Sequence, residues 1–184
     1  MCGIVGAVCN RDVFGILIEG LKRLEYRGYD SAGLSLIDAN SSLNTQKTIG
    51  RVADLEDLFN GEIPNGGLGI AHTRWATHGV PSSANSHPHT SGSISVVHNG
   101  IIENHNLLKE ELRDRGATLS SETDSEVIAH LIEFYSSETD SLKEAVNKTL
   151  SRLEGAYAIC VISKDYPDKM IGARSGSPLV IGLG

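Results

Sequence analysis

Apolar residues recur along this chain in two kinds of pattern, which predict its helices and strands. Helices are predicted at about residues 12–25, 52–59, 104–115, 124–135 and 141–153; the first and fourth have a clear apolar stripe. Short apolar runs predict strands at about residues 4–9, 32–38, 43–49, 68–71, 94–98, 156–163, 169–173 and 179–181. The order strand, helix, strands, helices, strands predicts an α+β fold in which two sheets pack together with helices outside.

Turn and cap residues mark the ends of several of these elements. Asp12 is expected to cap the first helix, and Gly116 to end the third. Residues 123–126 have the pattern of a capping box, so a helix is predicted to begin at about Asp124. The strand at 68–71 is expected to run into a loop at 72–79, and the pair Asn99-Gly100 to stop the strand at 94–98.

Composition and charge exclude several classes of protein. The net charge of -7 argues against a nucleic-acid binder or a protein that docks on anionic membranes. No apolar run is long enough to cross a membrane, and no secretory signal precedes the first strand. The 3 cysteines are irregularly spaced, which indicates neither a disulfide framework nor a zinc site, and we expect a protein of the reducing cytoplasm.

Cys2 directly follows the initiator methionine and opens the first predicted strand. Removal of Met1 would leave Cys2 with both a thiol and a free α-amine, which places a nucleophile and a base in one residue. An α-amine with a pKa of about 8 can take the proton of a thiol with a pKa of about 8.5. Such N-terminal nucleophiles perform acyl transfer. The alternative is that Cys2 is a small apolar residue at the start of a strand, inert like many buried cysteines.

The pair Asn99-Gly100 has two interpretations. Asn-Gly is a strong signal for a hairpin turn, but no clean alternating strand follows it. The functional interpretation is an oxyanion hole, in which a side-chain amide and a backbone N–H point at one atom. The residues alone leave both interpretations open.

Arg74 and Asp124 are candidates for binding the two charges of an amino acid. Arg74 lies among polar and aromatic residues, and a bidentate guanidinium suits a carboxylate. The alternative for Arg74 is a surface residue stacked on Trp75. Asp124 could bind an ammonium group, but an acid at the start of a helix is favourable in any protein because of the helix dipole.

Seven histidines raise the question of a metal site. His87 and His89 flank Pro88, and His72, His78 and His98 lie on nearby segments. However, the chain has neither the His-x-x-x-His spacing nor a Cys-x-x-Cys pair, so we expect no metal. We also expect no cofactor, because no glycine-rich phosphate-binding loop of the usual spacing is present.

Six segments in a fixed order carry a resemblance to a known family. They are MCGIVG (1–6), LEYRGYDSAG (24–33), GIAHTRWATHG (69–79), VHNGIIEN (97–104), SETDSEVI (121–128) and ARSGSPLVIG (173–182). The chain resembles the class II glutamine amidotransferases. The segments at 73–79 and 174–178 are more specific and resemble the glutaminase domains of the glutamine–fructose-6-phosphate aminotransferase (isomerising) family.

The resemblance implies an αββα sandwich of the N-terminal-nucleophile hydrolase type. It also implies that Cys2 attacks the side-chain amide of L-glutamine and that Asn99 and Gly100 hold the oxyanion. Arg74 would bind the α-carboxylate of glutamine and Asp124 its α-ammonium group.

The resemblance implies supporting roles for five more residues. Thr77 and His78 would belong to a loop that closes over the substrate, and Trp75 would lie where ammonia leaves. Arg27 and Gly28 would help to position the Cys2 end of the chain.

In that family a larger C-terminal isomerase part accepts the ammonia and makes glucosamine 6-phosphate, and the full-length enzyme is expected to be a homodimer. Residues 1–184 are expected to be the glutaminase domain alone. Two alternatives remain: a glutaminase domain of the amidophosphoribosyltransferase type, and a non-catalytic module that senses glutamine.

Overall fold

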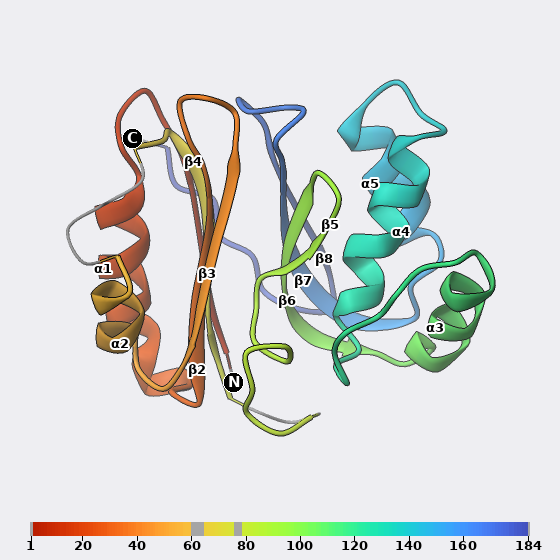
Figure 1. Ribbon diagram of the computed structural model, residues 1–184, viewed down its shortest axis with the longest axis horizontal. Coiled ribbons are helices and arrows are strands. Elements are labelled where there is room, and N and C mark those ends of the chain that lie inside the picture. Colours follow the sequence, from red (N-terminus) through yellow and green to blue (C-terminus); the bar gives the residue numbers. More distant parts are fainter. Residues whose placement is uncertain (1, 60–64, 76–78, 184) are drawn as a thin grey trace.

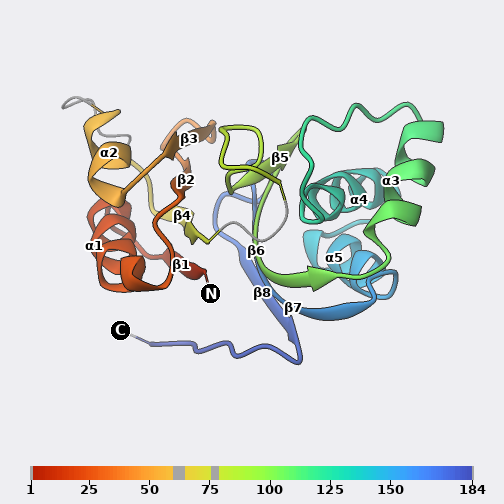
Figure 2. The ribbon, with the colours of Figure 1, turned by 90° about the horizontal axis from the view of Figure 1, so that it is seen from below.

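Two antiparallel sheets lie face to face in the middle of the molecule, and helices cover the outer face of each (Figure 1). The computed structural model describes residues 2–59, 65–75 and 79–183. Seen from below in Figure 2, the layers run in the order helices, sheet, sheet, helices. This arrangement confirms the predicted α+β fold with two packed sheets.

The first sheet has the strand order β1-β4-β2-β3. The helices α1 and α2 cover its outer face, where Leu17 and Leu21 of α1 pack with Leu34 and Leu36 of β2. Its elements are β1 (Gly3–Val8), α1 (Phe14–Leu24), the 3-10 turn η1 (Glu25–Arg27), β2 (Ser31–Ile37), β3 (Leu43–Ile49), α2 (Val52–Asp57) and β4 (Leu68–Arg74).

The second sheet has the strand order β5-β6-β7-β8. Three helices cover its outer face, where Val96 of β6 and Ile159 of β7 pack against Ile128 of α4 and Val146 of α5. Its elements are β5 (His89–Ser91), β6 (Ile94–Ile102), α3 (His105–Asp114), α4 (Glu126–Ser136), α5 (Leu142–Leu150), β7 (Gly155–Ser163) and β8 (Met170–Ser175).

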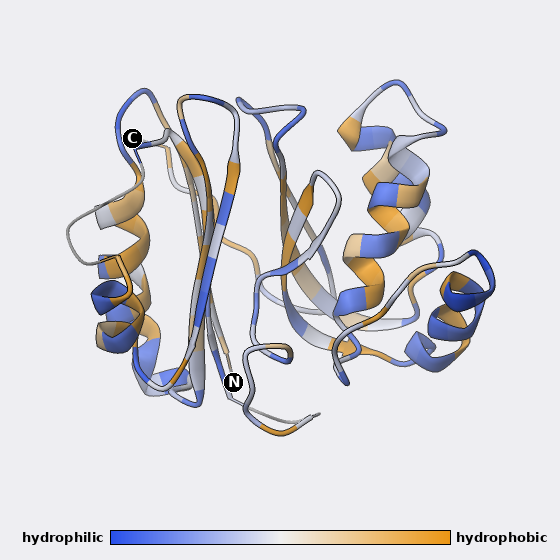
Figure 3. Ribbon diagram, in the orientation of Figure 1, coloured by the Kyte–Doolittle hydropathy of each residue, from blue (hydrophilic) through white to orange (hydrophobic). Residues whose placement is uncertain are grey.

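A third apolar layer joins the two sheets, and it includes Ile70 of β4, Val97 of β6 and Ile162 of β7. Successive residues of a strand point to opposite faces of the sheet. Val96 therefore faces the helices, whereas Val97 faces the other sheet. Where both faces of a strand are covered, the strand is apolar along much of its length; the edge strand β3 is the exception and is drawn largely in blue and white in Figure 3.

Several predicted boundaries are wrong. The strand β4 continues through His72 to Arg74, and β6 continues through Asn99 and Gly100, so this pair neither ends the strand nor forms a hairpin. The strand β5 was not predicted. The segment 179–181 forms no strand; it is extended, and Val180 is 90% exposed.

The predicted capping box at 123–126 is also wrong. The helix begins at Glu126, and the side chain of its N-cap residue, Ser125, makes no capping hydrogen bond. The Glu126 carboxylate instead accepts hydrogen bonds from Ser120 and Ser121. At the first helix the N-cap residue is Val13 and not Asp12. Asp12 lies one residue earlier, and its carboxylate still accepts a hydrogen bond from the Phe14 N–H over 3.0 Å.

In the part of the chain that the structure describes, no helix is long and apolar enough to cross a membrane.

Candidate active site

Strand alternation brings polar side chains from both sheets to one end of the space between them. In β4, Leu68 and Ile70 belong to the layer between the sheets. His72 lies two residues after Ile70, so its side chain points to the same face of the sheet. In β6, Asn99 lies two residues after Val97, which belongs to the same layer. His72 and Asn99 meet there, with 2.9 Å between His72 Nε2 and Asn99 Oδ1.

The His72 ring fixes the orientation of the Asn99 amide. Burial lowers the pKa of His72 to about 3, so the ring is neutral at pH 7. Because the Asn99 oxygen can only accept, Nε2 of His72 carries the proton and donates it. This contact turns the other end of the amide toward the N-terminus, where Asn99 Nδ2 donates to the Cys2 carbonyl oxygen over 3.1 Å.

The Cys2 sulfur is held by Trp75, the residue that follows β4. The Trp75 N–H donates a hydrogen bond to Sγ over 3.2 Å. Gly28 lies against this segment: a Cβ atom at Gly28 would be 2.6 Å from the Arg74 carbonyl carbon and 2.8 Å from the Trp75 nitrogen. A larger residue at 28 would displace the backbone that positions the thiol, so this close approach requires glycine.

The Cys2 thiol borders a small cavity of about 40 Å³. Residues from both sheets, and from the segment that precedes α4, line this cavity. They are Cys2, Arg74, Trp75, His87, His98, Asn99, Gly100, Thr123, Asp124 and Ser125.

Arg74 and Asp124 bring opposite charges to this cavity. Arg74 is 4% exposed, and its Nη2 donates to the Gly79 carbonyl oxygen over 3.2 Å. Burial lowers the pKa of Arg74, and the charges of Cys2, Asp30 and Asp124 act in the opposite direction. Because an arginine pKa starts above 12, the guanidinium still carries its charge at pH 7.

Asp124 is bound to strand β6 and does not cap a helix. It is 6% exposed, and its Oδ2 accepts a hydrogen bond from the Ile102 N–H over 2.8 Å. The Ser125 hydroxyl donates to Oδ1 over 3.3 Å. Because α4 begins two residues later, at Glu126, Asp124 lies just before the N-cap residue Ser125 and not inside the helix.

Four buried histidines lie beside the cavity. The ring centroids of His72 and His87 are 4.1 Å apart, and those of His87 and His89 are 4.7 Å apart. Burial lowers the pKa of His89 to about 3 and of His98 to about 4, and the pKa of His87 lies well below its usual value. These rings are neutral at pH 7, so Arg74 supplies the positive charge of the cavity.

Among the described residues, no group of three or more His, Cys, Asp or Glu side chains has a geometry that could hold a metal ion.

Six of the ten sequence-predicted site residues line this one cavity: Cys2, Arg74, Trp75, Asn99, Gly100 and Asp124. Gly28 lies directly behind it. Thr77 and His78 lie outside the described residues. Arg27 does not line the cavity; its guanidinium carbon lies 5.5 Å from the centroid of the Tyr26 ring, and its Nε donates to the Tyr26 hydroxyl over 3.0 Å.

Four lining residues were not predicted as site residues: His87, His98, Thr123 and Ser125. For the two histidines, the sequence suggests only a role as metal ligands. The sequence contains a signal for three of them: His98 directly precedes Asn99, while Thr123 and Ser125 flank Asp124.

Comparison with known proteins places this arrangement in a family. The pattern of the glutamine amidotransferase domain matches residues 72–181, which include Arg74, Asn99, Gly100 and Asp124. The chain belongs to the glutamine amidotransferase domain family. Its fold is the αββα sandwich of the N-terminal-nucleophile hydrolases.

Relatives resemble this domain along its whole length. The chain is 58% identical over 184 residues to a glutamine–fructose-6-phosphate aminotransferase (isomerizing) of Vibrio vulnificus, and 55% identical to the one of Escherichia coli. It spans 30% of the length of these relatives. The glutamine phosphoribosylpyrophosphate amidotransferase of B. subtilis, solved with ADP and GMP, superposes with a TM-score of 0.79 at 30% identity; the match covers 95% of this domain and 37% of that chain.

Proposed function

We propose that this amidotransferase domain hydrolyses the side-chain amide of L-glutamine through a thioester on Cys2. The observation that carries the proposal is one cavity that combines a thiol, an amide donor, a guanidinium and a carboxylate. Arg74 and Asp124 suit the α-carboxylate and the α-ammonium group of an amino acid. An amino acid held by these two residues has its side chain free to reach the sulfur.

In the first step the Cys2 sulfur attacks the amide carbon of glutamine, and the α-amine of Cys2, free once Met1 is removed, takes the thiol proton. The carbonyl oxygen becomes an oxyanion, and Asn99 Nδ2 and the Gly100 N–H donate to it. The carbon–nitrogen bond then breaks, the α-amine returns the proton to the leaving nitrogen, and ammonia departs.

In the second step water attacks the γ-glutamyl thioester. The same α-amine takes a proton from the water, and the same two donors hold the second oxyanion. The carbon–sulfur bond breaks, the proton returns to the Cys2 sulfur, and glutamate is released. The cycle consumes one water and needs no cofactor.

Trp75 is proposed to lie where ammonia leaves the site. Its side chain is 45% exposed and packs edge-on against Tyr29, while its backbone holds the Cys2 sulfur. Thr77 and His78 keep their proposed place in a loop over the substrate, on the strength of the family resemblance. For Arg27 we propose no contact with Cys2.

The relatives are longer proteins. In a protein of that length, this domain would supply ammonia to an isomerase part that converts fructose 6-phosphate to glucosamine 6-phosphate. Identity of 55–58% to the aminotransferases, against 30% to the phosphoribosylpyrophosphate amidotransferase, favours this acceptor. We further propose that the longer protein is a cytoplasmic homodimer.

The test is ammonia release from L-glutamine by the purified chain. Cys2→Ala is expected to abolish release. Cys9→Ala is the matched control, because Cys9 is also half-buried but bonds to the Arg11 carbonyl oxygen away from the cavity. Glutamine binding without ammonia release would instead indicate a glutamine-sensing module. Release that survives Cys2→Ala would overturn the thioester mechanism.

A further inference from the structure

The side-chain amide of Asn85 is buried and uses each of its hydrogen-bonding groups. It is 3% exposed. Its nitrogen donates to the Val80 carbonyl oxygen over 2.9 Å and to Glu122 Oε2 over 3.1 Å. Its oxygen accepts from the Glu122 N–H over 2.9 Å. Only an amide can donate and accept in this way, since a carboxylate has no hydrogen to donate.

On one side, Asn85 holds the segment that contacts Arg74. The Arg74 guanidinium donates to the carbonyl oxygen of Gly79, the residue before Val80. Gly79 has a φ of +77°, and a Cβ atom there would lie 2.6 Å from Asn85 Nδ2. The Asn85 amide therefore packs directly against the backbone that positions the guanidinium.

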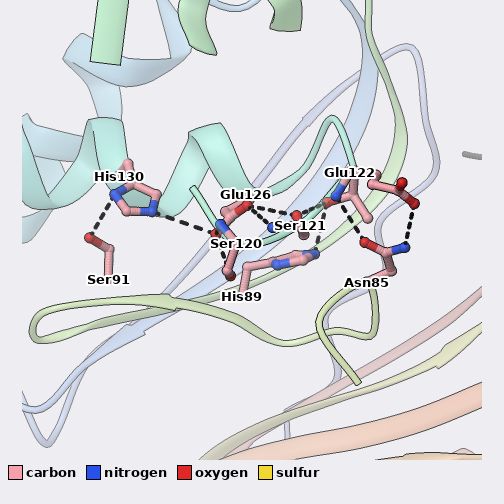
Figure 4. A network of polar contacts seen from close by, with 9 residues as sticks. Asn85, His89, Ser91, Ser120, Ser121, Glu122, Glu126 and His130 are labelled. Atoms are coloured by element: carbon pink, nitrogen blue, oxygen red, sulfur yellow. Dashed lines mark hydrogen bonds and ion pairs between the residues drawn. The ribbon is translucent and has the colours of Figure 1, made fainter. Parts of the chain in front are cut away.

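On the other side, Asn85 holds the segment that carries Asp124. Glu122 lies two residues before Asp124, and Figure 4 shows its backbone and carboxylate both bonded to Asn85. The same segment is fixed further along by Glu126, whose carboxylate accepts hydrogen bonds of 2.7–2.8 Å from Ser120 and Ser121.

We infer that Asn85 is a positioning residue that sets the spacing between the Arg74 guanidinium and the Asp124 carboxylate. The inference rests on the proposed function, in which these two groups bind the two charges of glutamine. Asn85 does not line the cavity itself. Its amide links the backbone beside one charged group to the backbone beside the other, so it governs how well an α-amino acid fits and contributes little to the chemistry at Cys2.

The decisive variant is Asn85→Asp, which keeps the size of the side chain and removes both donors. It also places a second carboxylate beside Glu122. We expect the KM for glutamine to rise by about tenfold while kcat stays within about threefold, because substrate binding is altered and the oxyanion donors are not. In the double variant Asn85→Asp with Glu122→Gln, the amide introduced at position 122 donates to the carboxylate introduced at position 85, and KM is expected to fall back by about threefold.

Asn104→Asp is the matched control. The Asn104 amide also bridges two backbone groups, donating to the Arg152 carbonyl oxygen over 2.8 Å and accepting from the Glu154 N–H over 3.2 Å. It lies outside the cavity, so this variant is expected to leave KM unchanged even where it lowers the melting temperature. If Asn85→Asp does not fold, Asn85→Ala serves in its place, because it removes the two donated bonds, together with the one from the Glu122 N–H, without adding a charge.

Three results would overturn the inference: an unchanged KM in the Asn85 variants, an equal rise in Asn104→Asp, or no recovery in the double variant. Failure of the proposed function has a different signature, because the unchanged chain would then release no ammonia at all.

Discussion

The Asn99 side-chain nitrogen donates to the Cys2 carbonyl oxygen over 3.1 Å, and this bond joins the two sheets at the cavity. Cys2 precedes β1 of the first sheet, and Asn99 lies in β6 of the second. One hydrogen of the amide is thus used to hold the backbone of Cys2, and the proposed mechanism assigns the other to the oxyanion. His72 fixes this orientation from the opposite end of the amide.

Asn99→Ala is therefore expected to lower kcat for ammonia release by roughly 10²–10³-fold, as the loss of one oxyanion donor does elsewhere. KM for glutamine should change little, because Arg74 and Asp124 remain. Steady-state kinetics on the purified chain would measure both. A kcat equal to that of the unchanged chain would remove Asn99 from the mechanism.

Arg74→Lys should raise KM more than it lowers kcat, the reverse of the effect of Asn99→Ala. A point charge replaces a planar fork, so the α-carboxylate of glutamine loses a bidentate contact. We expect KM to rise by roughly tenfold or more with a smaller effect on kcat, since the thiol and the oxyanion donors are untouched. The same KM in the variant and the unchanged chain would show that Arg74 does not bind substrate.

Much of the architecture could be predicted because each helix and sheet buries an apolar face. The stripe of Leu17 and Leu21 in α1, for example, is visible in the sequence and packs as expected on β2. The errors fall at polar residues that are buried without being part of an apolar face. His72 and Arg74 belong to β4, and Asn99 to β6, yet their polarity indicates a loop to any rule that reads hydrophobic runs.

The sequence predicts most residues of the candidate site but not the contacts between them. The sequence leaves open whether Asp124 serves the helix dipole or binds an ammonium group, and it gives no sign of the contact with the Ile102 N–H, 22 residues away. Likewise nothing local to Asn85 shows that it bonds to Glu122, 37 residues away. Such contacts depend on tertiary structure, which periodicity does not describe.

Thiol reactivity should separate Cys2 from Cys160. Burial raises the pKa of Cys160 to about 12, so its thiol stays protonated at pH 7.5 and at pH 9. Cys2 borders the cavity. A glutamine-analogue electrophile should therefore add once, at Cys2, when Met1 has been removed, and intact mass followed by peptide mapping would locate it. An adduct on Cys160 in the folded chain would contradict this.

Gly100→Ala should destabilise the chain much more than Gly116→Ala. Both glycines have a positive φ, +136° and +88°. A Cβ atom at Gly100 would overlap the Ala156 carbonyl oxygen, whereas nothing lies within 4 Å of one at Gly116. We expect a loss of about 1 kcal/mol at Gly116, from backbone strain alone, and more than about 3 kcal/mol at Gly100. Urea unfolding would measure both losses of stability. Equal losses would show that backbone strain alone sets the cost and that the overlap at Gly100 adds nothing.

The buried histidines should make the chain less stable in mild acid. Burial lowers the pKa of His72 and His89 to about 3 and that of His98 to about 4, against about 6.5 in the unfolded chain. Between these values the unfolded chain binds more protons than the folded one, so stability rises with pH. On going from pH 7.5 to pH 5, each of the three should cost about 2 kcal/mol.

Urea unfolding at a series of pH values would test this, with His89 as the site to vary. Its Nε2 lies 3.1 Å from the Thr123 hydroxyl, and a glutamine at 89 keeps a polar group there without a titrating ring. His89→Gln should reduce the loss between pH 7.5 and pH 5 by about 2 kcal/mol, whatever it does to stability at pH 7.5. An unchanged pH dependence in the variant would mean that His89 takes up no proton on unfolding and so is not held neutral by burial.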